Sequence, residues 1–157
     1  MGLDEYSGNY NLVKYNQEYS VGSFIVYPFK THHDAAQPAG YILYSKKLKE
    51  KLLFATDTNY LDCLFFGLHY IMIEANYSKE LLKKTVQCGV LNRKIANRIS
   101  CNHMELEDTK QYLSETDLRN VKEIHLLHLS RNNADPDMFV QEIQDLTEIP
   151  TFTKEWD

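Results

Sequence analysis

Several features that mark membrane, secreted and broadly basic proteins are absent from this sequence of 157 residues. No apolar run approaches the ~20 residues of a membrane-spanning helix, since the longest candidate, residues 61–73, is interrupted by Gly67 and His69. The N-terminal residues are acidic and polar, unlike a secretory signal. Seventeen basic and 22 acidic side chains give a net charge of −5, which disfavours a broad basic surface for nucleic acid but allows a local patch. We therefore expect a cytoplasmic protein that does not associate with membranes.

Cysteine is also scarce, and its spacing excludes common metal-binding and redox motifs. Cys63, Cys88 and Cys101 form no CxxC pair. An odd number of cysteines without such spacing favours three reduced and mostly buried thiols. A hydrophobic content of 43%, with eleven Tyr and seven Phe, is enough for a packed core and excludes a disordered chain. The length suits one domain, so we treat residues 1–157 as a single unit.

The order of predicted elements indicates a layered α/β (α+β) arrangement. Strands are predicted at residues 24–29, where Pro28 marks an edge or a strand end, and at 40–44, 52–55, 70–73, 124–129 and 149–152. The run 70–73 is continuously apolar, as in a strand that is buried on both faces. Helices are predicted at 78–89, with Ser78 as N-cap, at 91–99 and 105–113, and after Asp135-Pro136, with Met138, Ile143 and Leu146 inward. Residues 1–22 form a Tyr-rich leader or an edge hairpin, ahead of the main fold over 23–157.

Polar clusters with metal-ligating side chains stand at several of the expected element ends. They are Thr-His-His-Asp at 31–34, Ala-Thr-Asp-Thr at 55–58, Asn-His at 102–103 and Leu-His-Leu-Ser at 127–130. A strand fixes such a ligand while the following loop leaves room for a substrate. A single histidine or aspartate at a strand end is more often a structural or turn residue, so the order of the four clusters carries the interpretation.

That order, with its neighbours, resembles the nuclease and phosphodiesterase branch of the metallo-β-lactamase superfamily, which includes RNase Z, PhnP and the YycJ-like proteins. Residues 33–41 are similar to its HDA-x-x-P-x-GY segment and residues 54–58 to its TDT segment. Residues 73–76 resemble lEaN, residues 102–104 resemble GHLS, and residues 127–133 resemble HLS-x-NN. Asn-His-Met-Glu at 102–105 departs from GHLS, and Tyr-Ser at 77–78 stands where relatives often carry His-Asp.

The resemblance implies a role for each matched residue. His33 would bind the first metal ion, Asp57 would bridge two ions, and His128 would bind the second. His103 would protonate the leaving oxygen and act in catalysis together with Asp57. The matched side chains of Asp34, Asn76 and Ser130 would surround these ligands. The family hydrolyses phosphodiesters or acyl compounds with a pair of Zn²⁺ or Mn²⁺ ions, which lower the pKa of water.

The signature HxHxDH, which precedes these segments in the family and supplies three or four ligands, is absent, and no histidine precedes His32. The resemblance therefore covers the C-terminal half of the family's αββα sandwich, a mixed sheet with helices on one face. A catalytic Zn²⁺ usually takes about three protein ligands plus water. Here His33 and Asp57 serve one ion, and His128 and Asp57 the other. His32 does not fill the gap, because adjacent strand residues point to opposite faces.

Half a sandwich also leaves one sheet face without its partner sheet, so we expect a large apolar surface. An N-terminal-half polypeptide or a second copy of the chain would cover it. Three functions stay open at this point. The chain is half of a split or truncated metal-dependent hydrolase, inactive alone and acting on a small nucleotide or RNA when completed. It is a non-catalytic, self-associating or inhibitory binding protein, of phage origin in one version of this hypothesis. Or it is a fragment without an independent role.

Overall fold

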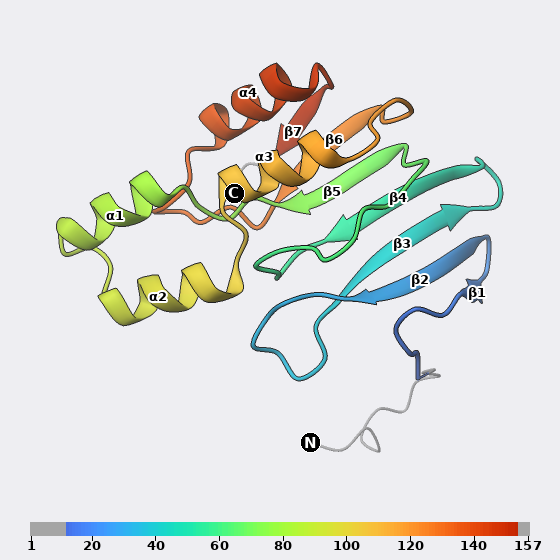
Figure 1. Ribbon diagram of the computed structural model, residues 1–157, viewed down its shortest axis with the longest axis horizontal. Helices are drawn as coiled ribbons and strands as arrows, with labels where there is room; N and C mark the ends of the chain where they lie inside the picture. Colours follow the sequence, from blue (N-terminus) through green and yellow to red (C-terminus); the bar gives the residue numbers. More distant parts are fainter. Residues whose placement is uncertain (1–11, 154–157) are drawn as a thin grey trace.

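The computed structural model describes residues 12–153, which form a seven-stranded sheet and four helices (Figure 1). The strands are β1 (Tyr19–Val21), β2 (Phe24–Lys30), β3 (Ala39–Ser45), β4 (Glu50–Ala55), β5 (Tyr70–Glu74), β6 (Glu123–Leu127) and β7 (Thr151–Thr153). The helices are α1 (Lys79–Gln87), α2 (Arg93–Asn102), α3 (Leu106–Glu115) and α4 (Pro136–Thr147). Every predicted helix and strand is present. Ser78 caps α1 as expected, since its hydroxyl accepts a hydrogen bond from Leu81 N.

The sheet is mixed, and its strands follow one another in sequence order from β1 to β7. β1 to β4 pair antiparallel, whereas β4 to β7 pair parallel. Parallel neighbours need crossover connections, and the segments that contain α1 to α3 and α4 provide two of them. Pro28 pairs with Tyr41 of β3 and lies beyond the three residues of β2 that pair with β1. The missing amide hydrogen of Pro28 therefore interrupts no strand pairing.

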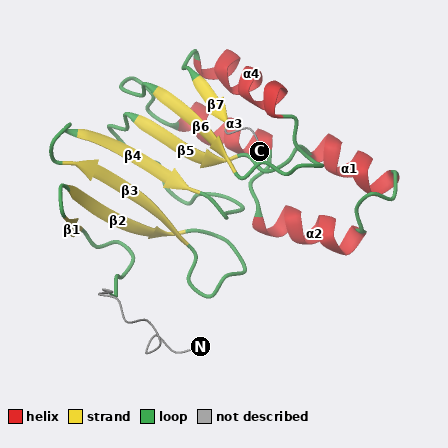
Figure 2. Ribbon diagram, turned by 180° about the vertical axis from the view of Figure 1, so that it is seen from behind, coloured by secondary structure: helices red, strands yellow, loops and turns green. Residues whose placement is uncertain are grey.

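Helices α3 and α4 and one loop cover a single face of the sheet, which confirms the predicted α/β half-sandwich. α3 and α4 lie in front of the sheet in Figure 1 and behind it in Figure 2. Their buried side chains share one core with the covered sheet face and with loop residues 61–68. The main members of this core are Leu53, Leu68, Ile71, Ile73, Met104, Leu113, Ile124, Leu126, Phe139 and Ile143.

The opposite sheet face carries large side chains that remain partly exposed. Residues that pair directly across neighbouring strands share a face of the sheet. Leu43 pairs with Leu52. Phe54 pairs with Tyr41 on one side and with Met72 on the other. None of these five belongs to a hydrophobic core cluster of the described residues. Within residues 12–153 no helix crosses this surface, which faces the viewer in Figure 2. We call it the open face and define it as Val26, Tyr41, Leu43, Leu52, Phe54, Met72 and Leu127.

Three expectations from the sequence are wrong in detail. β5 is buried on one face only: Ile71 and Ile73 are inaccessible, whereas Tyr70 and Met72 lie on the face that no described layer covers. In α4, Ile143 faces the core together with Phe139, but Met138 and Leu146 remain 36% and 44% exposed because they lie on the flanks of the helix. All three cysteines are free and exposed, since they lie in a surface loop and near the C-terminal ends of α1 and α2.

Of the proposed leader, the structure describes residues 12–22, which contribute β1 and a coil against β2. Asn16 N donates to Pro28 O, and Tyr15 Oη donates to Pro38 O. Residues 1–11 lie outside the described part of the chain. Among the described helices, none has the length and apolar character needed to cross a bilayer.

Candidate metal centre

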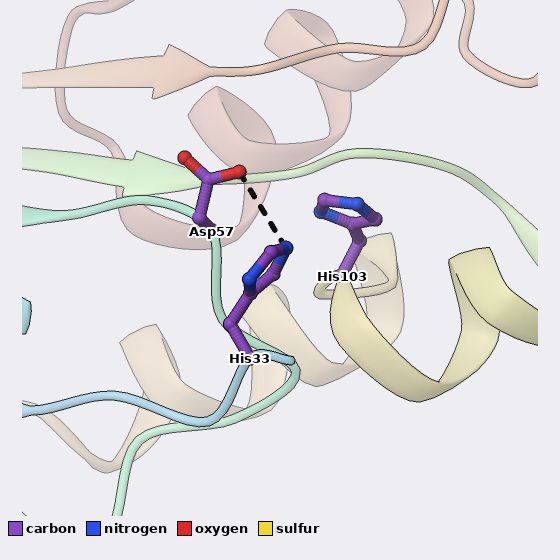
Figure 3. Close-up of side chains that lie close together, drawn as sticks. All are labelled: His33, Asp57 and His103. Atoms are coloured by element: carbon purple, nitrogen blue, oxygen red, sulfur yellow. Dashed lines mark ion pairs between the residues drawn. The ribbon is translucent and has the colours of Figure 1, made fainter. Parts of the chain in front are cut away.

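Five side chains of the types that bind metal ions in proteins meet at one end of the sheet. His33 follows β2, Asp57 follows β4, Glu74 ends β5, His103 follows α2, and His128 follows β6. Figure 3 shows His33, Asp57 and His103 from three separate segments, with their side chains turned toward one another. Strand ends that share a sheet edge bring residues together that are far apart in sequence. The structure therefore brings together the residues that the sequence analysis assigned to metal and acid roles.

Glu74 lies at the base of this cluster and is completely buried. Its Oε1 atom lies 2.8 Å from Nδ1 of His103 and 2.9 Å from Nδ1 of His128. Its Oε2 atom accepts a hydrogen bond of 2.7 Å from Thr58 N. An ionised carboxylate only accepts hydrogen bonds, so both imidazoles carry their proton on Nδ1. Their Nε2 atoms are left to bind a metal ion or to carry a transferable proton.

The charges of this network are mutually stabilising. Burial by itself opposes ionisation of Glu74, but hydrogen bonds from His103, His128 and Thr58 outweigh burial and lower its pKa. The hydrogen bond to Glu74 raises the pKa of His128 against the smaller opposing effect of desolvation, and the charge of Asp57 adds to the increase. A carboxylate and an imidazolium are thus favoured together at the base of the site.

Asp57 lies close to two histidines of the cluster. Its Oδ1 atom lies 3.9 Å from Nε2 of His33 and 3.5 Å from Nδ1 of His128. The ring of His103 packs edge-on between those of His33 and His128, with centroid distances of 5.4 and 4.9 Å. The cluster contains two groups of three potential ligands, and within each group the ligand atoms lie within 4.8 Å of one another. One group is His33, Asp57 and His103. The other is Glu74, His103 and His128.

The backbone presents two of these side chains in a conformation that few residue types adopt. Asp57 and His128 have φ angles of 51° and 58°, in the left-handed region. Asp and His tolerate this region better than most residues other than glycine and asparagine. The turn at His128 is held by Asn76, whose Nδ2 donates to His128 O and whose carbonyl oxygen accepts from Ser130 N. The strained positions coincide with the chemically important side chains.

The loop that carries His33 is tied to α2. Asp34 accepts from Arg98 Nε at 3.0 Å, and its backbone N donates to the buried Oδ1 of Asn102 at 2.8 Å. The other carboxylate oxygen of Asp34 lies 3.3 Å from Nδ1 of His33. The guanidinium of Arg98, through its hydrogen bond, holds the pKa of Asp34 below its usual value. Asp34 thus positions His33 relative to the helix that leads to His103.

The structure separates the remaining predicted residues by role. Asn76 shapes the backbone of the site, and the Ser130 hydroxyl accepts from Asn133 Nδ2 at 2.9 Å. His32 turns away from the cluster, because its Nε2 contacts Asp62 at 2.6 Å and its ring stacks on Tyr60. The expected reason, the alternation of faces along a strand, does not apply, since β2 ends at Lys30. The roles of His33, Asp57 and His128 as ligands and of His103 as an acid stay predictions.

The residue that sequence reasoning missed is Glu74, which received no role. A sequence signal for it exists. A glutamate that directly follows the apolar run 70–73 has to be buried with partners, because an unpaired buried charge is very costly. The donor set as a whole, imidazole nitrogens with carboxylate oxygens, fits Zn²⁺ or Mn²⁺.

Comparison with known proteins identifies the fold of the chain. No protein-family model matches the chain, and a search of curated proteins finds no match. Among solved structures, the metallo-β-lactamase fold protein YhfI from Bacillus subtilis matches with a TM-score of 0.64 and 14% identity, over 91% of this chain and 52% of YhfI. CmlA, a diiron β-hydroxylase from Streptomyces venezuelae, matches with a TM-score of 0.57 and 14% identity, over 90% of this chain and 32% of CmlA. A point variant of the CmlA β-hydroxylase matches with a TM-score of 0.58 and 14% identity, over 90% and 31%.

The chain therefore spans about half the length of YhfI and about a third of CmlA. The match includes nearly all of the described sheet and its helices, and the low identity limits it to architecture. This chain has the fold of half a metallo-β-lactamase fold protein.

Proposed function

We propose that the chain is the C-terminal half of a split or truncated metal-dependent hydrolase of the phosphodiesterase or nuclease type. The observation that carries this proposal is the convergence of His33, Asp57 and His128 at the sheet edge, beside the open face. A partner polypeptide would supply the HxHxDH ligands and cover the open face. The choice of the RNase Z, PhnP and YycJ-like branch rests on the resemblance of the sequence segments to the motifs of that branch.

In the completed site, His33 and His128 would offer imidazole nitrogens to metal ions, and Asp57 would offer a carboxylate that can span two of them. Bound Zn²⁺ or Mn²⁺ would supply a water of lowered pKa and neutralise phosphoryl oxygens. Glu74 keeps the Nδ1 proton on His103 and on His128, which fixes the tautomer of both rings. Nε2 of His103 would carry the proton that the leaving oxygen takes up.

Two observations support the need for a partner. The described residues offer two small ligand sets that share His103, whereas a pair of catalytic zinc ions uses about six protein ligands. The open face is the second observation. An uncovered sheet face with several large apolar side chains is typical of an interface.

The test uses this chain co-purified with a polypeptide that carries HxHxDH and is encoded beside it. Metal content is measured by elemental analysis, and hydrolysis by release of nitrophenol from bis(p-nitrophenyl) phosphate. We expect the pair to retain Zn²⁺ or Mn²⁺ and to lose both metal and activity in Asp57→Asn and in His128→Ala. His69→Ala is the matched control, because His69 directly precedes β5 at the end opposite Glu74, where its Nδ1 accepts a hydrogen bond from Lys51 N instead of contacting the site. A pair that takes up no metal, or that keeps it in both site variants, would refute the proposal.

The open face also favours a second candidate, a non-catalytic binding protein that associates with itself or inhibits another protein. This candidate predicts a stable homodimer of the isolated chain in light scattering. It also predicts that association and any inhibitory effect survive Asp57→Asn and His128→Ala. Loss of function in these variants, with folding intact, would contradict it.

A further inference from the structure

One segment of this acidic chain carries a net positive charge. Residues 75–104 contain six of the 17 basic side chains and one of the 22 acidic ones. The rest of the chain holds eleven basic and 21 acidic residues. The segment comprises α1, α2 and their connections, and we call it the α1–α2 hairpin. Its charge therefore has the opposite sign to that of the remaining protein.

Most of these positive charges are not neutralised by neighbours. Lys83, Lys84, Arg93 and Lys94 are exposed, and their side chains form no ion pair with residues 12–153. The other two have acidic partners: Lys79 Nζ lies 3.0 Å from Glu105, and Arg98 contacts Asp34. Internal pairing thus explains the two cations nearest the sheet and leaves the four nearer the tip available to an external anion.

The hairpin is a packed unit with its own small core. Leu82 of α1 and Ala96 of α2 are buried against each other's helix, with Tyr77 below them and Val86, Leu91 and Ile99 around them. Figures 1 and 2 both show α1 and α2 beyond the ends of β5 and β6, on the side of the molecule that holds the candidate metal centre. The lysines and arginines are therefore presented by a fixed surface.

The basic surface adjoins the candidate centre. Arg98 is one contact from His33, since it binds the carboxylate of Asp34 that lies against the His33 ring. α2 leads from Arg93 and Lys94 past Arg98 to His103 at its C-cap. Each helix is roughly 15 Å long, so an anion chain on the hairpin would be led from its tip toward the site.

We propose that the α1–α2 hairpin binds the phosphate backbone of a nucleic-acid strand and directs one phosphodiester to the candidate metal centre. This inference rests on the proposed function and specifies its substrate class. A strand with B-form spacing carries one phosphate per ~3.4 Å of axis, so the hairpin reaches at most about four phosphates and fewer of an extended single strand. Separate cations along two helices suit such a repeated charge, whereas a small nucleotide would use only one or two of them. Phosphate contacts of this kind position a strand without reading its sequence.

The test is fluorescence anisotropy with a fluorescein-labelled 20-nucleotide thymidine oligomer, the full chain and EDTA, at 50–200 mM salt. The hairpin variant is Lys83→Glu with Lys94→Glu. The matched control is Lys47→Glu with Lys49→Glu, which reverses two exposed lysines in the β3–β4 turn at the opposite end of the sheet. Both variants change the net charge equally, so only position distinguishes them.

We expect the hairpin variant to bind the oligomer about tenfold more weakly at 50 mM salt, and its salt slope to fall by about 0.7 per lost phosphate contact. The control should stay within about twofold of the wild-type chain. Equal losses in both variants, or no binding by the wild-type chain, would overturn the inference. So would binding to phosphatidylserine vesicles in place of the oligomer. EDTA removes metal ions, so this assay measures binding of the oligomer without metal. Its result is therefore independent of the metal-uptake measurement that tests the proposed function.

Discussion

Replacing Glu74 with Gln tests the central feature of the candidate site, one buried carboxylate that serves three donors. The amide keeps the size of the side chain but converts one acceptor oxygen into a donor NH₂. If the NH₂ group takes the place of Oε2, it faces Thr58 N–H across 2.7 Å. If it takes the place of Oε1, it faces the Nδ1 protons of His103 and His128. The first orientation leaves two donors facing each other inside the protein, and the second does so unless both imidazoles move their proton from Nδ1 to Nε2.

The expected cost follows from these contacts. Net hydrogen bonds to charged groups contribute about 1.5–3 kcal/mol, and an unsatisfied buried donor costs about 1–3 kcal/mol. We expect Glu74→Gln to lower the free energy of unfolding by about 2–4 kcal/mol in urea titration at pH 7. Glu123→Gln is the control, because Glu123 also contacts a histidine, His125, at 3.0 Å but on the surface. That control should lose less than about 1 kcal/mol. Equal losses in both variants would refute the reasoning.

Three further predictions concern the charged pair and the two sheet faces. The hydrogen bond to buried Glu74 raises the pKa of His128. The stabilisation from the positive charge of His128 is therefore complete below about pH 6.5 and is lost as the pH rises through the raised pKa. The urea midpoint of the wild-type chain should fall over that pH window, whereas the midpoint of His128→Gln should not. Leu53 is fully buried on the covered face, so Leu53→Ala should lower the free energy of unfolding by about 2–5 kcal/mol. Leu52→Ala, on the open face, should lower it clearly less in the same urea titration. Equal losses would contradict an uncovered face. A Cβ at Gly40 would lie 2.3 Å from Cζ of Phe29, so Gly40→Ala should cost about 1–3 kcal/mol, measured by thermal unfolding; a Phe29→Leu background should recover part of this loss.

The sequence predicted the elements well because each carries a local signal. Ser78 and Asp135 stand at helix starts, and both side chains accept a backbone hydrogen bond there. Alternating or apolar segments predicted the strands, and the polar clusters at their ends predicted the convergence of His33, Asp57 and His128. Strand ends converge because the sheet aligns them, so order along the chain carried three-dimensional information.

Other features depend on contacts that a local pattern does not contain. Glu74 has a shared role because His103 and His128, 29 and 54 residues away, both reach it. The apolar pattern of residues 70–73 indicates two buried faces, but burial on the second face requires a layer that the described chain does not provide. The hairpin charge was hidden in the net value of −5, since the acidic remainder outweighs it.

At Asp57 and His128, the left-handed backbone favours glycine for stability, whereas a metal site requires a side chain with a donor atom. Glycine adopts such φ angles without a steric penalty, so a library selected for thermal resistance alone would accumulate glycine there. A library selected for metal-dependent turnover would reject the same replacement, because glycine offers no donor atom. If the two selections gave opposite results at Asp57 and His128, the side chains at both positions would be needed for the reaction although their backbone conformation lowers stability.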